Sequence, residues 1–351
     1  MLNNILRDLQ SNNNGVAFSH SGVATQNYFF HPSFDKLWNI FAQMPDVTEE
    51  EDLTLFGDIP VGTFYYPSNS DDGCIKERKV VIPTTKRKIK PELIDGIAHF
   101  CTPQFFRGCN TLAKNIQKGV GLGIYTADTP FKQRLLYVIA YLVAKGINKE
   151  VYLQSCFANK NAQSNFLKRP QTYQGVFVEI EKCIAEGTAN YEANVLGSVS
   201  SNGALNNINA AEKGFEKAYE NMSDELMSYE ESELAIFTTD KVINNYRQSL
   251  KNKSQRNFDI TVNGVENIAW NNIPIKPIRY AQPKYTDHVW GVGSTRIILG
   301  HESVLAHAFD TDSEDLFMEM QYDKLNYRWQ VAYALQTAAN IVDPALVSVV
   351  S

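Results

Sequence analysis

The sequence lacks the features that mark membrane proteins and disulfide-bonded secreted proteins. No apolar run approaches the ~18 residues that mark a membrane span. The first residues, MLNNILRDLQSNNN, contain no apolar stretch typical of a signal peptide, so we expect neither secretion nor membrane insertion. The cysteines form no CxxC pair, and an odd number of them, 5, is a poor disulfide framework. We therefore expect a protein of a reducing cytoplasm.

Motifs for nucleotide and metal chemistry are incomplete. Gly119-Val-Gly-Leu-Gly123 lacks the second half of GxGxxG and the Lys-Ser/Thr of a P-loop. His301 and His307, with Glu302 between them, fit neither HExxH nor another common zinc spacing. The acidic residues 310–315 lack the central glycine of a calcium loop, and we expect a solvated turn there. The sequence predicts no cofactor and no metal.

The chain is acidic overall, and its most basic stretch lies in one place. A net charge of −6 gives no general affinity for nucleic acid, because phosphate binding depends on clustered Lys and Arg. The basic cluster comprises Lys76, Arg78, Lys79, Lys86, Arg87, Lys88 and Lys90. Two interpretations stay open for these side chains. They are the solvated face of a strand, or they pair with acidic patches on a neighbouring subunit.

The length and the periodicities predict a mixed α/β (α+β) protein with two subdomains. A chain of 351 residues exceeds the ~250–300 residues at which single cores stop growing. The strongest helical signal lies at 129–157, where Thr129 and Pro130 suit the first turn. Amphipathic helices are predicted at 33–43 and 210–227.

The stretch 233–283 has the clearest order of elements. An apolar strand at 234–237 precedes a helix that begins near Asp240. Asn263-Gly264 is a strong hairpin signal, and the strand that follows it contains Trp270. The segment 273–278 contains Pro274 and Pro277, which suit only a sheet edge or a rigid extended segment.

Strands are also predicted at both ends of the remaining chain. Residues 53–92 contain β-prone runs around a polar stretch, which predicts a long two-stranded excursion. The segment 295–300 is a strand. From 328 onward Trp329, Tyr333 and their alternate neighbours are large or apolar at period two, which predicts a strand with Trp329 buried on its inner face. Asp343-Pro344 then precedes a last apolar strand.

The order of these elements resembles the major capsid proteins of tailed bacteriophages with the Hong Kong 97-type fold. Asn272-Ile273-Pro274-Ile275-Lys276-Pro277 matches the family's segment G-[LI]-P-[VI]-x-P with Asn in place of the usual Gly. The segments 129–180, 204–283 and 295–350 match in family order and together cover most of the chain.

The resemblance implies a domain organisation. An N-terminal arm and short helix would occupy 1–52, and an extended loop 53–92. A peripheral domain would comprise 93–184 and 321–351 with its spine helix at 129–157, and a central axial domain 185–320. The expected core residues include Trp329, Tyr333, Trp270 and Pro274, and the expected assembly contacts include Lys76, Arg78, Lys79, Lys86, Arg87 and Lys88.

The function implied is that of a shell protein without catalytic residues. Pentamers and hexamers would close into an icosahedral head around double-stranded DNA, which is bound without sequence specificity. The partners would be copies of the chain itself, with scaffolding, portal and decoration proteins, and no membrane. Assembly would take place in the bacterial cytoplasm, and the mature protein would belong to the virion.

Two alternatives share part of these expectations. An encapsulin-like shell of a cellular nanocompartment has the same fold and packages enzymes. A cytoplasmic α/β enzyme would instead need a convergent polar pocket, for example one in which Cys101 or Cys156 meets a histidine and an acid.

Overall fold

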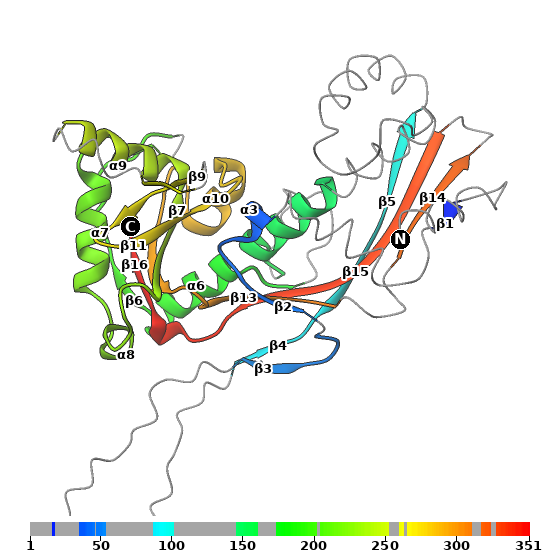
Figure 1. Ribbon diagram of the computed structural model, residues 1–351, viewed down its shortest axis with the longest axis horizontal. Helices are drawn as coiled ribbons and strands as arrows, with labels where there is room; N and C mark the ends of the chain where they lie inside the picture. Colours follow the sequence, from blue (N-terminus) through cyan, green and yellow to red (C-terminus); the bar gives the residue numbers. More distant parts are fainter. Residues whose placement is uncertain are drawn as a thin grey trace, which may run out of the picture.

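The computed structural model describes residues 16–17, 35–45, 47–53, 87–101, 145–160, 173–201, 204–252, 260–262, 265–310, 317–323 and 328–351. Figure 1 shows an elongated sheet that extends from a compact part made of a second sheet and most of the helices. Within these residues no helix is long and apolar enough to cross a bilayer.

The first sheet is built around one long strand, β15 (Arg328–Ile341). β5 (Glu92–Cys101) pairs with one side of it, and β14 (Phe317–Asp323) and β13 (Leu305–Phe309) share the other side, all antiparallel. The period-two pattern of the sequence is confirmed, because the alternate residues Val331, Tyr333, Leu335 and Thr337 are all buried.

Two short strands extend this sheet at its edges. β1 (Val16–Ala17) pairs with β14, and β2 (Ala42–Pro45) runs parallel to β13. Of the N-terminal arm expected at 1–52, the residues before 35 lie outside the described part except for β1.

The second sheet is mixed and has the order β10-β11-β7-β12-β16-β6. Its central strands are β7 (Leu234–Thr239), β12 (Ile297–His301) and β16 (Val347–Val350), and every residue in these three is buried. Its outer strands are β10 (Ala269–Trp270), β11 (Ile273–Ile278) and β6 (Asn190–Glu192). Continuous burial explains why these central strands read as apolar runs in the sequence.

Helices cover the second sheet and connect it to the first. α7 (Ala210–Glu220) packs on β12 and β16, and α9 (Asp240–Asn252) packs on β7 and β11. α6 (Val176–Ala185) contacts both β15 and α10 (Pro283–Trp290). The predicted helices at 210–227 and after Asp240 are confirmed, with α8 (Asp224–Met227) completing the first.

A helix over residues 145–157 lies between the two sheets. Tyr152 is fully buried in it, and its hydroxyl accepts a hydrogen bond of 2.9 Å from the N–H of Arg279, directly after β11. On the other side Tyr152 packs edge-on against Trp38, with ring centroids 5.5 Å apart. The described part of the predicted helix at 129–157 is confirmed, and residues 129–144 lie outside the described part.

The remaining hairpins agree with the turn signals. β8 (Ile260–Val262) and β9 (Val265–Asn267) pair across Asn263-Gly264. β3 (Glu51–Leu53) pairs with β4 (Arg87–Ile89), which is the base of the predicted two-stranded excursion. Residues 54–86 lie outside the described part.

One expectation about local structure was wrong, and a second is described only at its first residue. The helix predicted at 33–43 is only α3 (Asp35–Trp38), because residues 42–45 extend the sheet beside β13 instead. The solvated acidic turn at 310–315 begins with a buried residue, since Asp310 is 2% exposed and its N–H donates to the Gln336 carbonyl. Residues 311–315 lie outside the described part.

The sheets also divide the chain differently from the expected boundary at residue 320. β13 lies before that boundary but pairs with β15, and β16 lies after it but pairs with β12 and β6. Backbone pairing between distant segments decides sheet membership, and apolar patterning does not reveal it.

A close approach of two helices predicts the effect of substituting Gly175. A Cβ at Gly175 would lie 2.7 Å from backbone atoms of Cys156, Phe157 and Ala158. Because backbone atoms cannot yield as a flexible side chain does, Gly175→Ala should lower the free energy of unfolding by ~1–3 kcal/mol. Urea unfolding of the purified protein measures this.

Gly146→Ala is the matched control for this substitution. Gly146 is helical and exposed, and a Cβ there would meet nothing within 4 Å. The higher helix propensity of alanine should leave stability unchanged or raise it by up to ~1 kcal/mol. Equal effects of the two substitutions would contradict the close approach at Gly175.

Candidate functional site

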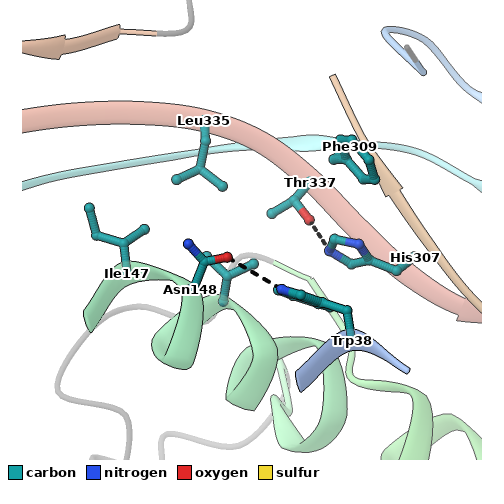
Figure 2. Close-up of a pocket in the computed structure, with 8 residues that line it drawn as sticks. Trp38, Ile147, Asn148, His307, Phe309, Leu335 and Thr337 are labelled. Atoms are coloured by element: carbon teal, nitrogen blue, oxygen red, sulfur yellow. Dashed lines mark hydrogen bonds between the residues drawn. The ribbon is translucent and has the colours of Figure 1, made fainter. Parts of the chain in front are cut away.

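The junction of the first sheet with helix 145–157 contains the most unusual polar cluster of the described residues. His307, on β13, is 1% exposed and stacks on Trp38 with ring centroids 4.3 Å apart. Its Nε2 and the Thr337 hydroxyl are 2.8 Å apart in a hydrogen bond. The indole N–H of Trp38 donates to Oδ1 of Asn148 at 3.3 Å. Figure 2 shows these two bonds on either side of the stacked rings.

The electrostatics of this cluster favour packing over catalysis. Burial lowers the pKa of His307 to about 3, so its imidazole stays neutral at ordinary pH. The adjoining cavity, lined by Ile147, Leu335 and Phe309 among others, has a volume of about 10 Å³. That volume suits one water molecule at most and leaves no room for a substrate.

A second small cavity lies where α9 and α10 begin. It also measures about 10 Å³, and its lining includes Thr239, Lys241, Thr286 and Asp287. Burial lowers the pKa of Lys241, and the charge of Asp287 opposes that shift. The cavity is again too small for an organic ligand.

The described part of the chain gives no support for a metal site or a reactive thiol. No three His, Cys, Asp or Glu side chains gather there in a way that could hold a metal ion. Burial raises the pKa of the Cys156 thiol well above its ordinary value. Since the thiolate is the nucleophile, this cysteine is inert. The side chain of Cys101 lies outside the described part.

Three residues of the predicted basic cluster, Arg87, Lys88 and Lys90, lie in the described part of the chain, and the first two form ion pairs. In β4, Arg87 lies 3.7 Å from Glu179 of α6 and donates to the sulfur of Cys183 at 3.0 Å. Lys88 pairs with Glu50 at 2.7 Å on the exposed side. Both residues therefore have partners within their own subunit. Lys76, Arg78, Lys79 and Lys86 lie outside the described residues.

The four expected core residues differ in their surroundings. Trp270 is 7% exposed and Tyr333 2% exposed, whereas Pro274 is half-buried. Trp329 lies in β15 opposite Phe100, and its side chain lies outside the described part. The alternation that predicted these positions shows which residues share a face of the sheet. It does not show how deeply other elements cover that face.

One exposed apolar surface was not predicted from the sequence. Leu93 and Ile97 of β5 are 49% and 59% exposed, whereas Ile94 between them is buried. Leu93 and Ile97 pair with Gln336 and Ala332 of β15, so they lie on the face of the sheet opposite the buried row of β15. The signal was present in the alternation of Leu93, Asp95, Ile97 and His99, which mixes aliphatic and polar residues on one face.

Comparison with solved structures identifies the fold. A chain of the satellite phage P4 procapsid including the size determination (Sid) protein has a TM-score of 0.53 and 11% identity, with 93% of this chain and 98% of that chain covered. A chain of the capsid of an empty GTA particle has a TM-score of 0.51 and 11% identity, with 91% and 90% covered. The chain has a phage capsid-protein fold.

The other comparisons add little to the assignment of this fold. The SrpI encapsulin of Synechococcus elongatus PCC 7942 has a TM-score of 0.44 and 9% identity, with 89% of this chain and 84% of that chain covered, a score too low to argue from. No protein-family model and no curated protein matches the sequence. The likeness is one of fold, since the identity to both capsid chains is 11%.

The buried histidine predicts a specific loss of stability in acid. The unfolded chain takes up a proton near the ordinary histidine pKa of 6.5, whereas folded His307 does so only at about 3. Between these values stability must fall as pH falls, by ~1.4 kcal/mol per unit. From pH 6.5 to 4.5 the wild type should therefore lose ~2–3 kcal/mol more than His307→Gln. Urea unfolding at the two pH values measures the difference, and equal losses would contradict it.

Proposed function

We propose that the protein is a shell subunit of the Hong Kong 97 type, in which many copies form pentamers and hexamers that close around double-stranded DNA. The capsid fold, matched over nine-tenths of the chain in two shell assemblies, is the observation that carries this proposal. The two cavities described above measure about 10 Å³ each, and neither could hold a substrate.

The proposed domains follow sheet membership. The first sheet, with β5, β13, β14 and β15, would be the peripheral domain, and the helix at 129–157 its spine. The second sheet, including β16, would be the axial domain around the capsomer centre. The segment 53–92 would reach a neighbouring subunit, with Lys76, Arg78, Lys79 and Lys86 as candidate contacts to its acidic patches.

The exposed face of β5 supports self-association. Strands with one solvated face normally carry polar residues on it, but Leu93 and Ile97 are large aliphatic side chains. No described strand pairs with the other edge of β5, and uncovered strand edges favour pairing with other chains. In a shell, neighbouring copies would cover this face and edge.

Substitutions on this face test the proposal. Leu93→Lys with Ile97→Lys should leave the fold intact, because both side chains are already about half exposed. Each lysine would have to be buried or displaced at a contact between copies, so the double variant should sediment as monomers where the wild type sediments as capsomers or shells. Circular dichroism and sedimentation velocity measure folding and assembly in parallel.

Ser228→Lys with Ser232→Lys is the control, since it adds the same charge at exposed positions near α8. Wild-type assembly by the Leu93 and Ile97 double variant would exclude this face as a contact. A loss of assembly in both double variants would indicate a general effect of charge.

The cargo distinguishes the two kinds of shell. Particles purified from their natural source should contain double-stranded DNA. The ultraviolet absorbance of the particles measures this nucleic acid. Particles that contain enzymes and no nucleic acid would instead support a nanocompartment shell.

A further inference from the structure

β5 combines an open backbone edge with an apolar outer face. Among the described strands it pairs only with β15, so its other edge has no described partner (Figure 1). Leu93 and Ile97 on its outer face are 49% and 59% exposed. A strand of 10 residues with these two features is a template on which another strand can pair.

The outer face of β5 has a definite order of side chains. Because successive residues of a strand point to opposite faces, this face carries four exposed residues: Leu93, Asp95, Ile97 and His99. Along the strand they are aliphatic, acidic, aliphatic and imidazole. This order limits which strand, in which register, can lie beside β5.

A second copy of β5 matches this order in one register. When two identical strands pair antiparallel about a two-fold axis, each residue lies opposite the one equally far on the other side of the central residue. With Ile97 at the centre, Ile97 lies opposite Ile97 of the second copy. Asp95 then lies opposite His99 of the second copy, and the same pair forms again on the other side of the axis.

The two adjacent registers toward the start of β5 match less well. With Gly96 at the centre, Asp95 would lie opposite Ile97 and Leu93 opposite His99, so each aliphatic side chain would meet a polar one. With Asp95 at the centre, two carboxylates would lie opposite each other, and like charges there destabilise a strand pair. Of these three registers, only the one about Ile97 places apolar against apolar and acid against imidazole.

We propose that β5 of one copy pairs antiparallel with β5 of a second copy about a two-fold axis at Ile97, which joins their first sheets into one continuous sheet. The partner on this surface is thus a second copy of the chain. The contact is closed, because each copy occupies the open edge of the other.

The role of this pair rests on the proposed shell function. Head-to-tail contacts close identical subunits into a ring, whereas a two-fold contact links two subunits only. The pair of β5 strands would therefore connect a subunit of one ring to a subunit of the next. Backbone pairing and the covered Ile97 would supply most of the affinity, while the two pairs of Asp95 and His99 select the register.

A symmetric disulfide tests the register. Directly opposite Cα atoms of a strand pair lie ~4.5–5.5 Å apart, which suits a disulfide. Ile97→Cys should therefore give a covalent dimer under mild oxidation, linked through residue 97 of both copies. Nonreducing electrophoresis and mass spectrometry of the linked peptides measure this, with the wild type as the control for native cysteines.

Asp95→Cys is the matched control for this disulfide. In the proposed register its two copies would lie ~14 Å apart, because four residues of strand separate them. That distance is too long for a disulfide, so this variant should give no link through residue 95.

An exchange of side chains tests the register without a covalent bond. His99→Asp would place carboxylates opposite each other on both sides of the axis, and it should weaken association roughly tenfold at pH 6. Asp95→His combined with His99→Asp exchanges the members of each pair, so association should return to within about threefold of the wild type. Sedimentation velocity over a range of concentrations measures association, and circular dichroism confirms that each variant is folded.

Three outcomes would overturn the proposal: no link through residue 97, an equal yield of links through residue 95, or no recovery in the exchanged variant. If Ile97→Cys fails to fold, the exchanged variant decides, because it leaves Ile97 in place. A linked dimer that never forms shells would support the β5 pair and contradict the proposed shell function. Normal shells in which Ile97→Cys forms no link would contradict the β5 pair alone.

Discussion

The burial of helix 145–157 between the two sheets is the interaction on which the rest of the structure depends. Residues 151–157 are buried without interruption, so this half of the helix has no solvated face. Tyr152 contacts Trp38 on one side and the backbone after β11 on the other. Phe157 packs against α6 through Phe177 and against α10 through Trp290, with ring centroids 5.3 and 5.7 Å apart. The helix therefore joins the first sheet to the second, together with α6.

A body built in this way suits a structural role. The two cavities described above are minute, whereas unusual features lie at the surface: the face of β5 with Leu93 and Ile97, and the β3–β4 pair. Repeated association of identical copies needs such surfaces, held in fixed directions by a rigid interior. Under the proposed shell function these surfaces would be contacts between neighbouring subunits.

The elements with regular periodicity could be predicted from the sequence, whereas the pairing between distant segments could not. β7, α9, the hairpin at Asn263-Gly264 and the long β15 follow from local patterns and turn chemistry. The helix expected at 33–43 failed because residues 42–45 pair with β13, more than 250 positions later. The interior role of Arg87 was missed for the same reason: a basic run looks solvated until α6 is placed beside it.

The most direct test is electron microscopy of the purified protein over a wide range of concentration and salt. Assembly through repeated contacts between identical chains predicts rings of five or six subunits, and closed shells built from them. A uniform monomer under every condition, with the same folded circular dichroism, would contradict a shell function. The protein would then be a capsid-like fold put to another use.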